Sequence, residues 1–299
     1  MALQTKHKAY LALACTSLVW GSTWVVSKVG VQKIPALELS AVRQLIAGVL
    51  FLSFFTIKGE KLPTKKQFGW LIVISFLMFL LGNGLSTWSV KYIPSGLAAL
   101  IAALYPLCVV VLEFLFFKRA AQSLLTFIGL FLGVGGIAIV FYENAFHHQP
   151  DGYFFGVILA LLAMVGWSLG TIFIARNKYA MNPYYALGWQ MIIGAALIFA
   201  LAIGTNNFIS ILKIPADVWW VLAYLVIMGS VLAFVAFLYS MKHLSPAVAS
   251  LYAYINPIVA IIIGSIILNE KLTGHIIIGS IVTLIGVYLV NYSVKRIKQ

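Results

Sequence analysis

The chain alternates between long apolar stretches and short polar ones, and this alternation predicts its helices. Ten stretches hold about 20 mostly apolar residues each, the length that a helix needs to cross roughly 30 Å of hydrocarbon. The connections are short, often contain proline or glycine, and leave no room for a soluble domain. We therefore predict an all-α integral membrane protein with ten transmembrane helices, over residues 9–28, 37–57, 68–90, 95–117, 123–142, 152–175, 184–203, 217–240, 246–268 and 275–294.

Composition supports a membrane protein over a soluble one. Of 299 residues, 63% are hydrophobic and 9% are charged, compared with roughly 25% charged residues in soluble domains. The net charge of +13 comes from basic residues that stand singly or in short clusters between the apolar stretches. That distribution does not make a nucleic-acid-binding face. Cys15 and Cys108 both lie in apolar stretches, so we expect no structural disulfide.

The two halves of the chain repeat one another at a constant offset of 151 residues. This offset relates Trp88 to Tyr239, Pro106 to Pro257 and Gly135 to Gly286 without a gap. Duplicated apolar chains are typical of transporters with a substrate site between their repeats. The predicted division is a first repeat (1–142), a connection (143–151), a second repeat (152–294) and a basic tail (295–299).

Basic residues predict the orientation. If the N-terminus is cytoplasmic, the inner connections carry fourteen lysines and arginines and the outer connections carry five, with Arg43 inside the second span. The positive-inside rule then favours cytoplasmic N- and C-termini in a multi-pass protein of the cell (inner) membrane. Because each repeat has five spans, the second repeat must enter from the opposite face. The repeats are therefore predicted to be inverted, as alternating access requires.

Several short motifs resemble the paired EamA repeats of the drug/metabolite transporter superfamily. They are Trp20-Gly21-Ser22, Arg43, Lys91-Tyr92-Ile93-Pro94, Tyr105-Pro106, Ser245-Pro246, Asn256-Pro257 and Leu268-Asn269-Glu270-Lys271-Leu272. The resemblance implies a ten-helix inner-membrane carrier of small metabolites, often an exporter of amino acids or related compounds. The first repeat departs from the pattern, because Lys118-Arg119 stand where the second has Asn269-Glu270.

Aromatic and polar residues within the spans suggest a substrate site near the midplane. Paired residues at i and i+4 share a helix face, and aromatic walls bind varied solutes without burying a charge. For any single tryptophan or tyrosine, anchoring at the membrane interface is the competing explanation, most seriously for Trp88. The candidate substrate-binding residues are Trp20, Arg43, Asn83, Trp88, Tyr105, Trp167, Gln190, Tyr239, Tyr252 and Asn256.

Four charged or helix-bending positions have two interpretations each. Arg43 either binds a substrate carboxylate or has a structural role. Glu113, the one carboxylate well inside a span, is either a proton-coupling residue or an interface residue near Lys118. Pro106 and Pro257 are either matching hinges or inherited packing features. We expect Glu270 and Lys271 to lie in a solvated connection.

Other classes of function find little support. The chain has no phosphate-binding G-x-x-x-x-G-K-[ST] loop, no metal-ligand motif and no cluster of catalytic groups. We expect no cofactor, no metal and no enzymatic activity, and a secondary or facilitative transporter rather than a channel or an intramembrane lipid-modifying enzyme. A multidrug efflux carrier is the nearest alternative. Gly129 and Gly133 are expected to let helices pack closely within the fold. The expected partners are a small metabolite and the lipid bilayer. The expected oligomeric state is a monomer or a weak homodimer.

Overall fold

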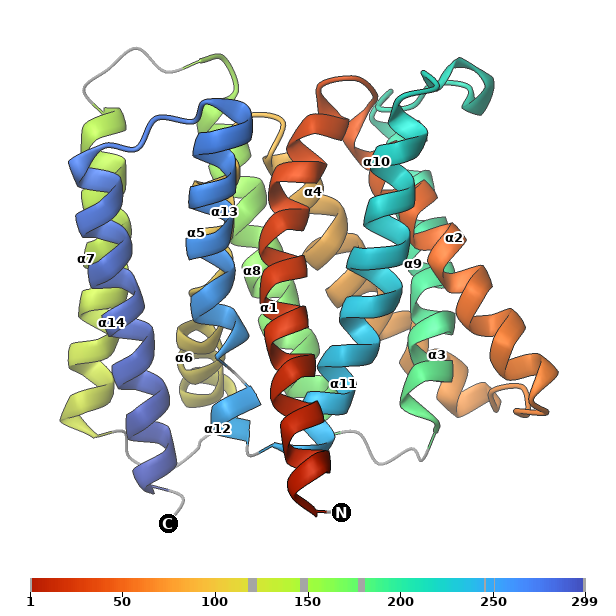
Figure 1. Cartoon of the computed structure of the whole chain (residues 1–299), viewed down its shortest axis with the longest axis horizontal. Coiled ribbons are helices and arrows are strands. Elements are labelled where there is room, and N and C mark those ends of the chain that lie inside the picture. Colours follow the sequence, from red (N-terminus) through yellow and green to blue (C-terminus); the bar gives the residue numbers. More distant parts are fainter. Residues whose placement is uncertain are drawn as a thin grey trace.

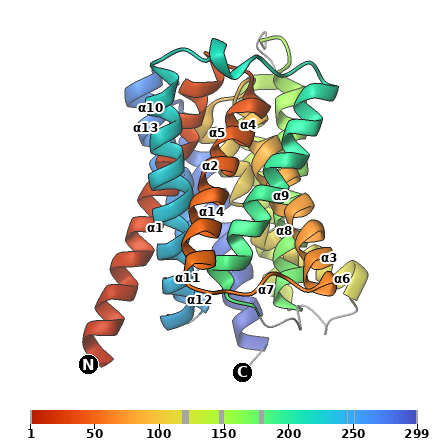
Figure 2. The ribbon, with the colours of Figure 1, turned by 90° about the vertical axis from the view of Figure 1, so that its right-hand side faces the viewer.

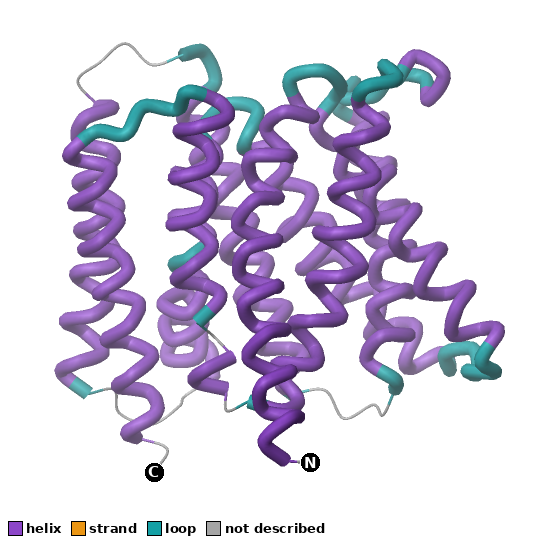
Figure 3. The backbone as a smooth tube through the Cα atoms, viewed as in Figure 1, coloured by secondary structure: helices purple, strands orange, loops and turns teal. Residues whose placement is uncertain are grey.

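The computed structural model describes residues 2–117, 123–145, 150–176, 181–244, 246–249 and 251–297, and within these ranges the chain is helical without strands (Figures 1 and 3). The first half contains α1 (Ala2–Val31), α2 (Ala36–Ile57), α3 (Lys65–Ile74), η1 (Ser75–Leu85), α4 (Ser86–Ser89), α5 (Ser95–Ala102), α6 (Tyr105–Phe117) and α7 (Leu124–Ala145). The second contains α8 (Tyr153–Ala175), α9 (Pro183–Gly204), η2 (Ile211–Lys213), α10 (Val218–Tyr224), η3 (Leu225–Leu232), α11 (Ala233–His243), α12 (Pro246–Ala249), α13 (Tyr252–Leu268) and α14 (Gly274–Ile297). Lys118 and Arg119 lie outside the described residues.

The predicted spans are confirmed. Nine helical stretches of the described chain are long and apolar enough to cross a membrane, and they coincide with nine predicted spans. The remaining predicted span, 246–268, holds α12 and the shorter apolar helix α13. The largest boundary difference is at the start of the first span, where Thr5 replaces residue 9.

Local sequence explains where several helices begin. Thr64 forms a capping box with Gln67 at the start of α3, so two backbone N–H groups that lack helical partners are satisfied. At the start of α9, the Asn182 side chain accepts a hydrogen bond from Tyr184 N at 3.1 Å, and Pro183 takes the first helical position, where no N–H is needed.

Both chain termini lie at the same end of the bundle (Figures 1 and 2). We call this the terminal end and the opposite end the distal end. The distal end carries the connections 32–35, 90–94, 205–217 and 269–273. Helix α1 runs toward the distal end and α8, the first helix of the second half, runs away from it (Figure 1). The two halves therefore have opposite orientations along the bundle axis.

The two halves share one core. The most extensive helix contacts join α7 to α14, α2 to α9, α1 to α13, and α8 to η1, and each pair combines an element from each half. Between α7 and α14 the backbones touch through glycine: a Cβ on Gly286 would lie 2.3 Å from Gly133 N, and one on Gly129 would lie 2.8 Å from Gly286 O. The expectation that Gly129 and Gly133 pack helices within the fold is confirmed.

Two spans contain π-helical stretches at related positions, which the sequence did not predict. These are η1 in the third span and η3 in the eighth, and the offset of 151 carries Ser75, where η1 begins, to Val226 within η3. π-Helical turns are rare and concentrate at functional sites. Gly82 and Asn83 of η1 line the cavity described below, and Gly229 and Ser230 of η3 accept hydrogen bonds from two of its lining residues, Trp20 and Arg43.

The helix breaks near the two prolines do not lie at equivalent positions of the two repeats, contrary to the expectation of matching bends. In the fourth span α5 ends at Ala102 and α6 begins at Tyr105, so Pro106 is the second residue of a new helix, where proline is tolerated. In the ninth span Pro257 lies inside α13, and the interruption comes earlier, between Ala249 and Tyr252. Repeat symmetry therefore does not extend to the helix breaks, and a hinge role for either proline stays a prediction.

Candidate functional site

A cavity of about 140 Å³ lies between the two halves of the bundle. Its walls come from α1, α2, η1, α4, α5, α6, α8, α11 and α13. One set of lining residues, which we call the aromatic group, comprises Trp20, Tyr105, Trp167, Phe234 and Tyr252. A second set, which we call the polar group, comprises Thr23, Ser27, Arg43, Asn83, Ser86 and Thr87. On α1, Ser27 lies about 10 Å nearer the distal end than Trp20, so the cavity has an aromatic and a polar portion.

Trp20 is at the centre of the aromatic group. Its indole N–H donates a hydrogen bond to the Gly229 carbonyl in η3 at 3.0 Å. Its ring centroid lies 5.0 Å from that of Phe234 and 5.3 Å from that of Tyr252, and it meets the Trp167 ring edge-on at 6.5 Å. These contacts fix the indole of the first half against the second half of the protein, so one face of the cavity is a rigid apolar wall.

The tyrosines of the fourth and ninth spans meet across the repeat interface. The Tyr252 hydroxyl donates to the Tyr105 hydroxyl at 3.2 Å, and the two rings are stacked with centroids 6.3 Å apart. With its amide nitrogen toward α1, Asn256 donates to the carbonyls of Ser17 at 2.8 Å and Tyr252 at 3.0 Å. The repeat-related pair Tyr105 and Asn256 thus lies in one network at the cavity wall.

Arg43 is the charged member of the polar group. The residue is only 6% exposed, and its Nε donates to the Ser230 hydroxyl in η3 at 2.8 Å. Gly229 leaves room for the guanidinium, because a Cβ there would lie 3.0 Å from Nη2. Within the described part of the chain, no aspartate or glutamate forms an ion pair with Arg43. The nearest acidic residue along α2, Glu38, instead accepts a hydrogen bond from Ile209 N at 3.0 Å.

A second cavity of about 220 Å³ lies toward the terminal end. Residues near the starts of α3 and α9 line it, among them Gln67, Trp70 and Pro183, together with Gln190. Trp167 and Phe234 line both cavities, so these two rings lie between them. The two cavities therefore adjoin one another at these two aromatic side chains.

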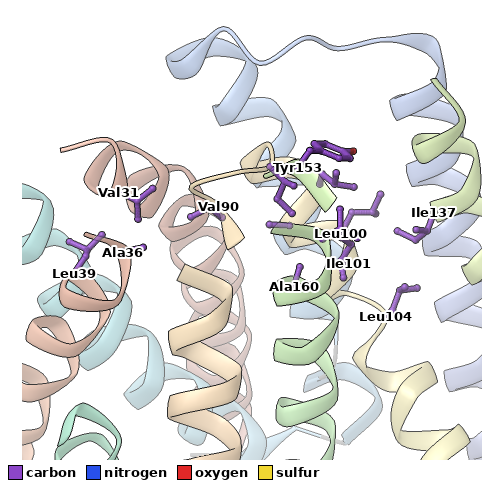
Figure 4. Close-up of a cluster of buried hydrophobic side chains, with 14 of the residues drawn as sticks. Val31, Ala36, Leu39, Val90, Leu100, Ile101, Leu104, Ile137, Tyr153 and Ala160 are labelled. Carbon is purple, nitrogen blue, oxygen red and sulfur yellow. The ribbon is translucent and has the colours of Figure 1, made fainter. Parts of the chain in front are cut away.

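Apolar side chains cover the distal side of the central cavity. Val31, Ile34, Val90 and Ile93 follow or precede the cavity-lining positions toward that end, and each is at most 5% exposed. Figure 4 shows Val31 and Val90 in this buried cluster, beside Ala36 and Leu39. The distal end is thus closed by tight packing.

Glu270 adds a polar clasp to the distal closure, contrary to the expectation of a solvated connection. Its carboxylate accepts hydrogen bonds from Ser95 N at 2.7 Å, Ser95 Oγ at 2.9 Å and Gly96 N at 3.3 Å. Pro94 precedes α5 and provides no side-chain cap, so Glu270 caps this helix from the other repeat. Lys28 Nζ, whose charge interacts with Glu270, donates to the Ile93 carbonyl at 3.0 Å. Lys271 is exposed, as expected.

The structure brings together seven of the ten predicted binding residues. Trp20, Arg43, Asn83, Tyr105, Trp167, Tyr252 and Asn256 line the central cavity.

The other three lie elsewhere. Gln190 lines the second cavity. Trp88 packs edge-on against Phe155 with ring centroids 5.3 Å apart, and the Tyr239 ring lies tilted against the His243 ring with centroids 4.3 Å apart. Neither lines a cavity described here.

Some lining residues were missed, and Glu113 has an unexpected partner. Phe234 and Met164 line the cavity, but in sequence they are ordinary apolar helix residues with no signal of their own.

Glu113 does not line the cavity, and its Oε1 lies 3.8 Å from Nη2 of Arg176 at the end of α8. The described residues contain no group of three or more His, Cys, Asp or Glu side chains able to hold a metal ion.

Ten apolar helical segments, two halves of opposite orientation and a cavity between them define a membrane transporter built from two repeats. The EamA-like transporter family model matches residues 7–142 and 154–292. The chain therefore belongs to the EamA-like transporter family, and the resemblance inferred from its motifs is confirmed.

Relatives and a solved structure agree with this assignment. The chain is 29% identical over 286 residues to the uncharacterized inner membrane transporter YedA of Escherichia coli K12, covering 93% of this chain and 91% of YedA. It is 25% identical to the uncharacterized transporter YoaV of Bacillus subtilis, covering 97% and 99%. A crystal structure 17% identical in sequence superposes with a TM-score of 0.63, covering 97% of this chain and 99% of the other, which supports the fold alone.

Proposed function

We propose that this EamA-family transporter is a secondary or facilitative carrier that exports small metabolites, amino acids or related compounds, by alternating access. The observation that carries the proposal is the central cavity, which both repeats line with aromatic and polar side chains. Such walls suit a small solute with one polar and one apolar end.

The closures on the two sides of the cavity support alternating access. Packed apolar residues and the Glu270 clasp cover the distal side, whereas on the terminal side the cavity adjoins a second cavity, with which it shares Trp167 and Phe234 as lining residues. Our proposed orientation places the terminal end in the cytoplasm of a cell with an inner membrane, because most basic residues lie there. The protein would then load its solute from the cytoplasm.

Counterflow in proteoliposomes tests the proposed function. Purified protein would be reconstituted into vesicles preloaded with unlabelled amino acids, and uptake of each labelled amino acid would be followed. We expect transient accumulation for a subset of them, and its loss in Trp167→Ala at matched protein content. Trp220→Ala is the matched control, because that ring is 81% exposed and lines neither cavity. Absence of counterflow for every amino acid, with accumulation of hydrophobic cations instead, would favour a multidrug carrier.

A further inference from the structure

Among the described residues that line the central cavity, one carries a fixed positive charge and none is acidic. The charged residue is Arg43. Arg43 also has no ion-pair partner elsewhere among the described residues, as shown above. An arginine buried without a counter-ion is costly, and such charges inside membrane proteins pair with one another or mark substrate pathways.

The orientation of the guanidinium leaves its terminal nitrogens available. Nε is the one guanidinium nitrogen with a hydrogen bond in the described structure, and it is held by Ser230. The two terminal amino groups present the forked pair of donors that binds a carboxylate bidentately. Asn83 in the same polar group has a buried side-chain oxygen without a partner in the described structure. This oxygen can accept a hydrogen bond from a donor group of the ligand.

We infer that Arg43 binds the carboxylate of the transported solute, and that this site takes small amphipathic carboxylates whose apolar part lies against the aromatic group. The inference rests on the proposed function and narrows its substrate class. Because the lining offers no carboxylate to pair with an ammonium, the site discriminates against cationic compounds. It therefore disfavours the multidrug alternative wherever the drug is a cation.

The first test uses the unaltered protein and measures binding. The probes are four compounds of similar shape: 3-phenylpropanoate, its primary amide, 3-phenylpropylamine and phenylalanine. Ligand-dependent stabilisation of the detergent-purified protein against heat reports binding whether or not transport occurs. We expect 3-phenylpropanoate to bind about 10- to 100-fold more tightly than the amide, from the strength of charge-assisted hydrogen bonds, and the amine not to bind. An amide or amine that binds as tightly as the carboxylate overturns the inference.

Phenylalanine distinguishes two sources of the same carboxylate. Binding comparable to that of 3-phenylpropanoate supports α-amino acids as substrates. Binding only of the monoanion supports organic acids. Both outcomes place the carboxylate at Arg43, provided that the variants below agree.

The second test uses variants of Arg43. Arg43→Gln is expected to bind the acid and the amide about equally, whereas Arg43→Lys is expected to keep a weakened preference for the acid because it keeps the charge without the fork. Lys91→Gln is the matched control: it also removes one positive charge, but Lys91 is exposed and does not line the cavity. An unchanged acid-to-amide ratio in a folded Arg43→Gln protein refutes the inference, and if that variant does not fold, Arg43→Lys and the probe series decide. Failure of the proposed function looks different, because the acid would still bind while counterflow is absent.

Discussion

Replacing Glu270 with alanine should open the distal end of the transporter. The change removes hydrogen bonds of 2.7, 2.9 and 3.3 Å that cap α5 from the other repeat. Hydrogen bonds to a charged group stabilise a fold by about 1.5–3 kcal/mol, and loss of a helix N-cap costs about 1 kcal/mol. Because all three bonds share one partly exposed carboxylate, we expect a total of about 2 kcal/mol, which shifts an equilibrium about 30-fold.

Cysteine accessibility measures this shift. In a protein whose Cys15 and Cys108 are replaced by alanine, a cysteine at cavity-lining Ser27 would be labelled with a membrane-impermeant maleimide added from the distal side. We expect Glu270→Ala to raise the labelling rate at least tenfold, because the clasp holds only the distally closed state. The effect of Glu270→Gln should be smaller, since its amide keeps one acceptor oxygen.

Asp217→Asn is the matched control for the clasp. Asp217 also joins the two repeats at the distal end, through an ion pair with Lys33, but its side chain is 56% exposed. The hydrogen bond from Lys33 lowers the pKa of the Asp217 carboxyl, which is therefore ionised at neutral pH. Exposed pairs contribute little, so labelling should stay at the parental rate. If folded Glu270→Ala protein is labelled no faster than Asp217→Asn, the clasp does not hold the distal end closed.

Three further predictions concern topology, coupling and packing. Cysteines at Gln149 and Gln299 should react with impermeant reagents from opposite faces of the membrane, and reaction from one face would contradict the predicted orientation. If Glu113 carries a coupling proton, Glu113→Gln should abolish the pH dependence of transport while substrate binding stays intact; unchanged pH-dependent flux would leave the carboxylate a structural role beside Arg176. Gly136→Leu should lower the thermal stability of the detergent-solubilised protein by several degrees, because even a Cβ there would lie 2.4 Å from Thr283 N in α14. Gly274→Leu, which meets nothing within 4 Å, is the control, and equal stability of the two variants would contradict the close packing of α7 and α14.

The sequence predicted the spans well because a bilayer imposes a strict length and polarity on each helix. It also predicted part of the central cavity, since residues such as Trp20, Asn83 and Asn256 are polar or amphipathic where lipid-facing helices are apolar. In these cases the local sequence around each residue was enough for the prediction. Repeat symmetry was a useful guide for Tyr105 and Asn256, which meet the same wall of the cavity.

Features that depend on the angle around a helix axis were not predictable in this way. Trp88 and Tyr239 are related by the repeat, but neither lines the two cavities and each packs on a neighbouring ring. In an all-apolar helix the hydrophobic pattern does not distinguish the lipid-facing side from the protein-facing side. The sequence therefore does not determine which of these sides a tryptophan lies on. The π-helical stretches η1 and η3 further change the angular position of the following residues around the helix axis, and no residue type in the sequence predicts these stretches.

The distal clasp shows that two related repeats need not have equivalent closures. An offset of 151 relates Glu270 to Arg119 and Ser95 to Pro246. An arginine side chain cannot accept a hydrogen bond, and proline has neither a hydroxyl nor a backbone N–H to donate. At the equivalent sequence positions the first repeat therefore lacks the acceptor of the clasp and the second repeat lacks its main donor. Because an equilibrium between two states follows from interactions made in only one of them, the clasp would stabilise the distally closed state of the proposed alternating-access cycle.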